Sequence, residues 1–221
     1  MVNKLLITIV IGLVALSLGL WAIVATQPPP GSNVVPGVAA GNVFTYSIKG
    51  YASITGENGS IPENFLEINK TDWYRVTITS VAGHEVNFTT TWHFINGTEI
   101  ENMGNVDVYT GADNQVFWAI YPANLTLNNL ISPGGSDGTI VNQTETRTYK
   151  SGDRETNIMT MQKQFYDASD PEKVVNDYIY VHFDKATGML VELKDMRLYS
   201  VPEIILTTEQ VLISSNVWAV S

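Results

Sequence analysis

The chain has 221 residues, with 22 Asp and Glu against 12 Lys and Arg, so its formal net charge is −10 at pH 7. Such a negative field repels nucleic acid and anionic lipid headgroups, and it argues against both as partners. The hydrophobic fraction of 44% is too high for a disordered chain, and the absence of cysteine excludes disulfides, thiolate metal sites and a thiol nucleophile.

The first predicted element is an uncharged apolar stretch at residues 5–25. As a helix it would extend roughly 31 Å, which matches the hydrocarbon thickness of a bilayer. The apolar core of a signal peptide is shorter, about 7–15 residues, and Ile23 stands where a cleavage site needs a small side chain. We therefore expect an uncleaved signal anchor, a single transmembrane helix, with a cleaved signal peptide as the alternative.

The charges around this stretch predict its orientation. Lys4 is the only charged residue before it, and the next charge is Lys49. The positive-inside rule then places residues 1–4 in the cytoplasm and the rest of the chain outside the cell membrane. Residues 26–42 are uncharged and rich in proline and glycine, which predicts a stalk. Residues 43–221 are long enough for one extracytoplasmic domain with its own core.

From residue 43 the apolar residues recur with period two, which is typical of strands. Residues 43–54 form the first predicted strand, in which Phe44, Tyr46 and Ile48 share one face. The clearest hairpin has its turn at residues 82–84. Its return strand is apolar on one face and wholly polar on the other, as expected for an antiparallel sheet with one buried side.

Turn residues separate the other predicted elements. Asn96-Gly97 predicts a type I′ turn, whose two central residues both have positive φ. In the segment from Asp184 to Gly188, we expect the glycine to be left-handed and the Asp side chain to accept turn amides. One helical turn is predicted at 62–67, and residues 123–131 suit a short helix or an irregular segment. Further strands are predicted at 98–102, 106–109, 116–121, 139–150, 154–165, 174–183, 189–199 and 204–213.

The pattern as a whole is mainly β, with about ten strands and meander-like spacing that favours antiparallel neighbours. We expect one antiparallel domain in the form of a curved sheet, a half-barrel or a sandwich.

Residues with catalytic or metal-binding chemistry are scattered. The three histidines show no metal-ligand spacing, and a surface or half-buried position suits each of them better. The acidic residues at 167–172 lack the spacing of an EF-hand loop, so a solvated charge cluster is preferred to a calcium site. No nucleophile elbow, P-loop or dinucleotide motif occurs. We predict no catalytic residues, no metal and no cofactor, and hence no enzyme.

Aromatic residues are the candidates for ligand binding. The predicted strand 174–183 is apolar on one face and carries Tyr178 and Tyr180 on the other. A sheet that is apolar on both sides packs against a second layer or lines a hydrophobic hollow. An ordinary core is the first interpretation; in the second, Trp92, Trp118, Tyr178 and Tyr180 would contact an apolar ligand.

Six Asn-x-Ser/Thr sequons lie in the predicted exterior part, where glycosylation could occur. A β surface rich in Thr and Asn is the alternative reason for them. The acceptor residues are Asn58, Asn69, Asn87, Asn96, Asn124 and Asn142.

The chain resembles a loose group of archaeal exported proteins of unknown function. The resemblance rests on the N-terminal anchor, on the sequence GNVFTY at 41–46, and on FDKATGMLVE at 183–192. It implies an anchored β domain and no particular activity. A fainter likeness, of fold alone, is to LolA-like lipoprotein carriers, whose curved antiparallel sheet holds lipid.

These features predict a membrane-anchored cell-surface glycoprotein that serves binding or envelope structure, with a surface glycan or protein as a partner. The alternative is a carrier or sensor of a lipid or other apolar ligand in a concave sheet. An extracytoplasmic hydrolase is a minor alternative.

Overall fold

The computed structural model describes residues 34–55, 59–113, 119–167, 170–200 and 203–221, which belong to one compact unit that begins at Val34. The predicted anchor at 5–25 lies outside these residues. Within them, no helix is long and apolar enough to cross a bilayer. The end of the predicted stalk is part of the unit, because Val34 and Val38 are buried in its core. The domain therefore begins at Val34 and not at Val43.

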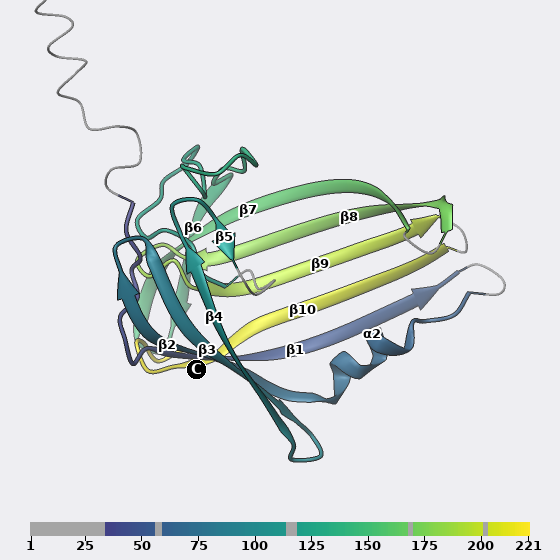
Figure 1. The fold of residues 1–221 in the computed structure, drawn as a ribbon, viewed down its shortest axis with the longest axis horizontal. Coiled ribbons are helices and arrows are strands. Elements are labelled where there is room, and N and C mark those ends of the chain that lie inside the picture. The colour runs from purple at the N-terminus through teal and green to yellow at the C-terminus, as the bar shows by residue number, and fades with distance from the viewer. Residues whose placement is uncertain (1–33, 56–58, 114–118, 168–169, 201–202) are drawn as a thin grey trace, which may run out of the picture. The chain divides into compact units, whose positions relative to one another are not determined.

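Ten strands form one antiparallel sheet in the order β5-β4-β3-β2-β1-β10-β9-β8-β7-β6 (Figure 1). The mainly β prediction is confirmed, and the described residues form a single open sheet and not a sandwich. A helical turn, α2 (Glu63–Glu67), and a 3₁₀ turn, η1 (Ile68–Lys70), lie between β1 and β2. The strands are β1 (Val43–Ile54), β2 (Thr71–Ala82), β3 (Glu85–Phe94), β4 (Glu99–Asp107), β5 (Ala112–Asp113), β6 (Gln143–Tyr149), β7 (Gly152–Asp167), β8 (Asp170–Asp184), β9 (Leu190–Ser200) and β10 (Glu203–Ser215).

The core lies on one face of this sheet, the inner face, which carries Tyr46 of β1 and Tyr74 of β2. At one end of the sheet this face is covered by residues 34–38 and by the long connection from β5 to β6, whose buried side chains include Tyr121. The Tyr121 ring lies 4.7 Å from the ring of Phe183 of β8. The Tyr46 hydroxyl donates to the carbonyl of Leu190 at 3.0 Å, which satisfies its polar atom inside the core.

At the other end, β7–β10 and β1 extend beyond the covered region, with α2 beside them (Figure 1). The Phe65 ring lies over Gly50 of β1, where an added Cβ would meet the ring at 3.1 Å. Asn69 of η1 pairs with the backbone of the same glycine: its Oδ1 accepts from the Gly50 N–H, and its Nδ2 donates to the Gly50 carbonyl, both at 2.8 Å. The helical segment is thereby tied to β1 where β2 has left that strand.

The turn at Asn96-Gly97 forms, but the type I′ prediction is wrong. Gly97 has a φ of +82°, whereas Asn96 is not among the described residues with positive φ. The Gly97 N–H donates to the Phe94 carbonyl at 2.8 Å, and the Phe94 N–H donates to the Thr98 carbonyl at 2.9 Å. This is a three-residue loop that ends in a left-handed glycine, the next most common hairpin connection.

Other predicted elements agree with the observed strands in part. The first strand, the hairpin around Ser151 and the helical turn at Glu63–Glu67 are confirmed. The strands predicted at 98–102 and 106–109 are one continuous strand, β4, and the stretch 123–131 is irregular. The acidic residues at 167–172 do not form one loop, because β7 runs to Asp167 and β8 begins at Asp170. In the strand predicted at 116–121, residues 116–118 lie outside the described residues, and Ile120 makes an isolated bridge with Met189.

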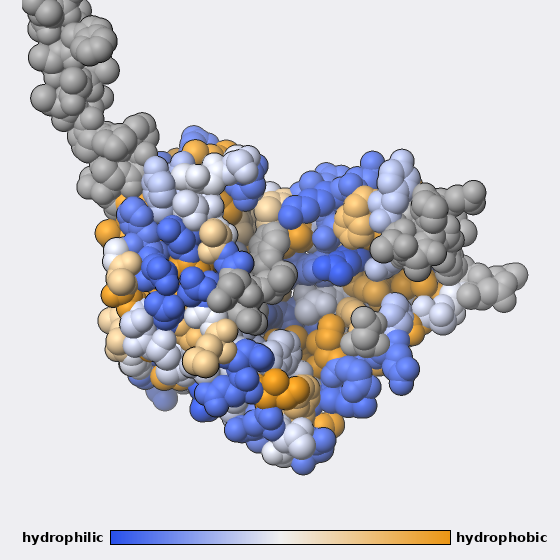
Figure 2. All heavy atoms as spheres, viewed as in Figure 1, coloured by the Kyte–Doolittle hydropathy of each residue, from blue (hydrophilic) through white to orange (hydrophobic). Residues whose placement is uncertain are grey.

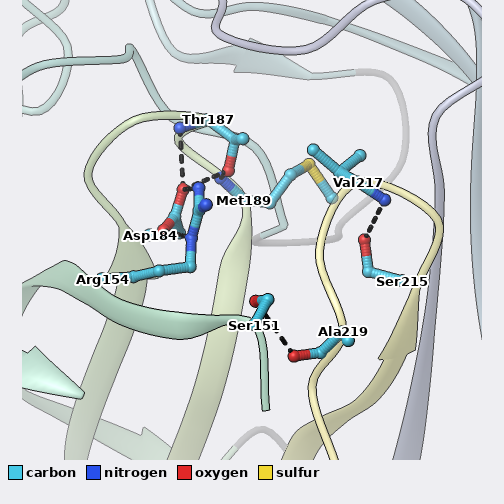
Figure 3. Close-up of polar contacts among 8 residues, drawn as sticks. All are labelled: Ser151, Arg154, Asp184, Thr187, Met189, Ser215, Val217 and Ala219. Carbon is cyan, nitrogen blue, oxygen red and sulfur yellow. Dashed lines mark hydrogen bonds and ion pairs between the residues drawn. The ribbon is translucent and has the colours of Figure 1, made fainter. Parts of the chain in front are cut away.

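The turn between β8 and β9 is held by an ion pair between the buried Asp184 and the half-buried Arg154 (Figure 3). Asp184 is 1% exposed and accepts from the Thr187 N–H at 2.9 Å and the Thr187 hydroxyl at 2.7 Å, as predicted for this turn. The same carboxylate accepts from Nε and Nη2 of Arg154 at 2.7 and 2.9 Å. The Arg154 guanidinium also lies 4.3 Å from the ring centroid of Trp218. One arginine thus links β7, this turn and the C-terminal segment.

Candidate functional site

Charged residues occupy inner-face positions where β7, β8 and β9 extend beyond the covered end of the sheet. Asp177 of β8 stands opposite Lys163 of β7 on one side and Arg197 of β9 on the other. Asp195 lies two residues from Arg197 on the same face and opposite Thr208 of β10. The strand register therefore brings together side chains from four strands, among them two carboxyl groups, Asp177 and Asp195, the carboxyl pair.

Arg197 binds one oxygen of each carboxyl group. Its Nη2 donates to Oδ2 of Asp195 at 2.9 Å, and its Nε lies 3.9 Å from Oδ2 of Asp177. The Oδ1 atoms of both Asp177 and Asp195 are buried and have no hydrogen-bond partner among the described residues. The same holds for Nε2 of Gln210, on the inner face of β10. Asp177 and Gln210 are only 5% and 4% exposed, so solvent contributes little to either group.

This environment perturbs the titration of Asp177. Burial raises the pKa of Asp177 to about 6, and a hydrogen bond with Asp195 and the charge of Asp195 act in the same direction. The charges of Arg197 and Lys163 lower it. Neither Oδ1 atom has a donor while both carboxyl groups are ionised, whereas a proton on one of them can be donated to the other. The carboxyl pair therefore favours a state in which it holds one proton.

A cavity of about 320 Å³ is bordered by Asp195 of the carboxyl pair, whereas Asp177 does not line it. Asp195 and Arg197 form its charged part. The other lining residues are Pro62, Phe65, Ile68, Tyr199, Leu206 and Thr208. The hollow therefore has an apolar wall, largely from the helical segment and the neighbouring strands, and a charged floor. Figure 2 shows hydrophilic and hydrophobic residues side by side on this part of the sheet. Such a combination orients a ligand by a few polar groups and holds it by apolar contact.

A second cavity of about 320 Å³ lies at the covered end of the sheet. It is lined by apolar residues of β4, β7 and the β5–β6 connection, among them Val106, Tyr121 and Met161, and by Asp113 and Asp137. Burial raises the pKa of Tyr121 well above its ordinary value, so this phenol stays neutral. Met161 lines the second cavity and Asp195 the first, and both lie opposite Ile179 of β8 in the strand register, so both cavities lie on the inner face.

The aromatic residues predicted to bind a ligand are not gathered at either cavity. Trp92 of β3 is on the inner face and packs in the core, with its ring 4.6 Å from that of Tyr74. Tyr178 and Tyr180 alternate with Asp177 along β8, so they lie on the outer face. Trp118 lies outside the described residues. The structure thus separates Trp92 from the two tyrosines.

The outer face has a charge cluster of its own, next to Tyr180. Arg147 of β6 donates to Glu145 at 2.7 Å and to Glu192 at 2.9 Å, and it also contacts Nδ1 of His182. Burial, and then the charge of Arg147, lower the pKa of His182. Because these charged groups pair with one another, the cluster is an ion-pair network on the surface of the sheet.

The sequon asparagines differ in their contacts. Asn58 lies outside the described residues, and the amide of Asn69 is paired with Gly50. Asn96 is exposed at a hairpin tip, where its Oδ1 accepts from the Thr98 N–H and hydroxyl. The remaining acceptors lie in β3 (Asn87), in the β5–β6 connection (Asn124, left-handed with a φ of 58°) and just before β6 (Asn142).

The carboxyl pair was missed at the level of sequence, although β8 contains a signal for it. Val175, Ile179 and Val181 share the buried face of this strand, and Asp177 takes the position among them where an apolar residue is expected. A charged residue in phase with buried ones marks a functional or ion-paired position. The partner residues on β9 and β10 show no comparable signal in the sequence.

Among the described residues, no group of three or more His, Cys, Asp or Glu side chains is arranged to hold a metal ion. Comparison of the chain with protein-family models and with curated proteins finds no match.

Proposed function

We propose that the chain is a membrane-anchored cell-surface protein that binds an amphipathic small molecule in the hollow beside the carboxyl pair. The observation that carries the proposal is the placement of buried polar atoms without a partner next to an apolar wall. Leaving a buried acceptor unsatisfied costs about 1–3 kcal/mol, and more when the group is charged. A buried polar atom without a partner calls for a physical reason, and a functional role is the reason proposed for this site.

The apolar part of the ligand would lie against the helical segment. Phe65 and Ile68 face the cavity together with Leu206 of β10. Since α2 and η1 are short and join the sheet mainly through Phe65 and Asn69, a small shift of this segment would open the hollow. The long apolar stretch at residues 5–25 supports the anchor, and the net charge of −10 suits a domain that stays clear of anionic headgroups.

Native mass spectrometry of protein extracted from membranes tests the binding function. We expect the wild-type chain to retain a small molecule and the variant Thr208→Trp, whose indole would fill the hollow, to lose it. Thr207→Trp is the matched control, because Thr207 is the neighbouring residue of β10 but lies on the outer face, opposite Met196. Equal retention by both variants would remove the hollow as the binding site.

The proposed location has its own test. An amine-reactive reagent that does not cross membranes should label Lys150, which is exposed next to the β6–β7 turn, on intact cells. Labelling only after lysis would contradict the cell-surface location. Transfer of the retained molecule to acceptor vesicles would identify a carrier, and its retention would favour a sensor.

A hydrolase is the second candidate, favoured by the carboxyl pair itself. A carboxyl group with a pKa of about 6 beside an ionised partner has the properties of a general acid. Substrate turnover that vanishes in Asp195→Asn, with a wild-type rate that falls as the pH rises through about 6, would favour hydrolysis over binding.

A further inference from the structure

We propose that the outer face of the sheet at β7–β10 and β1 is a self-association surface, on which a second copy of this chain packs face to face. The inference goes beyond the proposed binding function, because the hollow lies on the opposite, inner face of the same strands.

Two rows of uncharged side chains cross this part of the outer face. Alternate residues of β7, β8, β9, β10 and β1 align in the strand register, so each strand contributes one residue to each row. The first row is Gln164, Asn176, Leu198, Ile205 and Ser53, and the second is Gln162, Tyr178, Met196, Thr207 and Tyr51. These ten residues, the neutral rows, include no Asp, Glu, Lys, Arg or His.

The charged residues that border the neutral rows balance one another. Next to the second row, the charged groups of Lys194 and Glu209 lie 3.3 Å apart, and Lys49 stands opposite Glu209. Glu203 precedes the first row on β10 and is exposed. Two positive and two negative charges therefore flank the face, and none interrupts it.

Charge decides which face can meet a copy of itself. The chain has a net charge of −10, so two copies repel each other. The outer face of β3 and β4 is acidic in spite of Arg75 and His93. Its carboxylates are Glu85, Glu99, Glu101 and Asp107. A two-fold contact through that half would bring like charges together, whereas a contact through the neutral rows avoids this cost.

The side chains of this face have the composition of a protein interface. Leu198, Ile205 and Met196 are neighbours at its centre and are half-buried. Tyr51 in the second row is 54% exposed, and Tyr180, next to that row on β8, is 40% exposed. Interfaces between proteins have an apolar centre and a polar rim, and they are rich in tyrosine and methionine and poor in lysine and glutamate.

The amide side chains favour a protein partner over a neutral glycan. Nε2 of Gln164 donates to Oδ1 of Asn176 at 3.0 Å, and Nε2 of Gln162 donates to the Tyr178 hydroxyl at 3.4 Å. A glycan would depend on such amides for hydrogen bonds to its hydroxyl groups. Because the amides already pair along the sheet, they can be covered by another neutral surface at little cost.

The size of the face is sufficient for a specific dimer. At about 4.8 Å between strands and about 3.4 Å per residue, the five strands over the length of Thr160 to Tyr166 span roughly 24 Å by 24 Å. Two copies would bury roughly 1,100 Å² in total, slightly more than the ~1,000 Å² expected of a specific interface. Packed in this way, two open sheets form a sandwich.

Sedimentation equilibrium of the full chain in density-matched detergent micelles tests the inference. We expect a reversible equilibrium between monomer and dimer from micromolar to millimolar concentration. The affinity should rise several-fold when the salt concentration is raised from about 20 mM to about 150 mM, because salt screens the repulsion between the copies. An interface held by ion pairs would show the opposite trend.

Met196→Glu should weaken the dimer at least about a hundredfold, since it places a charge in the apolar centre of the interface on both copies. Met103→Glu is the matched control and should leave the dimer unchanged, because Met103 is 82% exposed on the outer face of β4, outside the neutral rows. If Met196→Glu does not fold, Tyr51→Glu serves in its place, since that side chain is exposed.

A monomer at every concentration would overturn the inference, and binding of a neutral polysaccharide by that monomer would assign the face to a glycan. A dimer that persists in both Met196→Glu and Tyr51→Glu would also overturn it, because the contact would then lie elsewhere, for example in the anchor. None of these results bears on the hollow, which is tested by retention of the small molecule.

Discussion

At the scale of single residues, Asp177 is where burial and charge conflict most. Its pKa is about 6 in the folded chain and near 3.9 for an unfolded aspartate. Between these values the folded state holds the proton and the unfolded state does not, so the free energy of unfolding falls as the pH rises from about 4 through about 6. Ionisation of Asp177 therefore lowers the stability of the folded chain.

We predict that Asp177→Asn removes this pH dependence and raises the melting temperature above pH 6. The amide is neutral at every pH, and its N–H can donate to Asp195. Thermal unfolding from pH 4 to pH 8 is the measurement. Glu101→Gln, an exposed change on β4, should keep the wild-type slope. An unchanged slope in Asp177→Asn would mean that the carboxyl group is ionised throughout this range.

Asn69 and Asn96 lie in identical sequence motifs but in opposite environments. A glycosylated asparagine is a secondary amide, which is trans, so its remaining N–H points away from its own oxygen. Asn69 uses both Oδ1 and the N–H on the same side to pair with Gly50. A sugar would occupy the position of that N–H.

We therefore predict that Asn96 carries a glycan in a host with the modification pathway and that Asn69 does not. Peptide mass spectrometry of the native protein tests both positions together. The variant Asn69→Asp, which lacks the donor, should lose about 1 kcal/mol of stability. A glycan at Asn69 on folded protein would contradict the pairing with Gly50.

At the scale of elements, the turn at Gly188 leaves less room for a side chain than the β2–β3 turn does. Gly188 has a φ of +73°, and a Cβ there would lie 1.9 Å from the Tyr121 carbonyl oxygen. Gly83 in the β2–β3 turn has a φ of +60°, and a Cβ there would meet nothing within 4 Å. The two turns share the left-handed backbone and differ in the space around it.

Gly83→Ala should therefore cost only the backbone strain, about 1–2 kcal/mol, whereas Gly188→Ala should cost several kcal/mol more than that. Denaturant unfolding of the two variants measures the difference. Equal costs would mean that the β5–β6 connection moves away from the turn without penalty.

Most strands could be predicted from the sequence because one face of each is buried and the other is wet. The bounds of β1 follow directly from the alternation that includes Phe44 and Tyr46. The failures have local reasons. At Asn96-Gly97 the dipeptide allows more than one hairpin loop, and the longer one formed. The sequence predicts two strands within 98–109 because Asn102, Gly104 and Asn105 interrupt the alternation, whereas pairing with β3 continues β4 through these residues.

At the scale of the whole molecule, the Arg154–Asp184 pair connects segments that are far apart in the sequence. The Asp184 side chain is 1% exposed and the Arg154 side chain 23% exposed, so removing the carboxylate leaves a half-buried guanidinium without its ion-pair partner, and breaking such a pair costs up to about 3–5 kcal/mol. We predict a loss of this size for Asp184→Ala, measured by denaturant unfolding. Glu155→Gln, which removes the exposed partner of Lys185, should cost at most about 1 kcal/mol. Similar losses in both variants would contradict the role assigned to burial.

The candidate site could not be predicted in the same way as the strands. Its residues come from β7, β8, β9 and β10, and they meet only through a register that the sequence does not reveal. The aromatic content of β8 predicts ligand contacts at Tyr178 and Tyr180, but the side of a strand that faces the hollow depends on which face the β5–β6 connection covers. The position of Asp177 among the apolar residues of one strand face is the local sequence feature that indicates the site.

The pairing of β1 with β10 in the middle of the sheet has a consequence for how the protein is made. β1 pairs with β10, for example with Lys49 opposite Glu209. Since β1 is synthesised first among the strands and β10 last, the edge of β1 that pairs with β10 stays unpaired until synthesis of the domain is complete. Until then the nascent chain presents an open strand edge, and the closing step requires contacts between distant parts of the sequence, which are slow to form. Maturation should therefore be post-translational, with a window in which chaperones or neighbouring copies compete for β1.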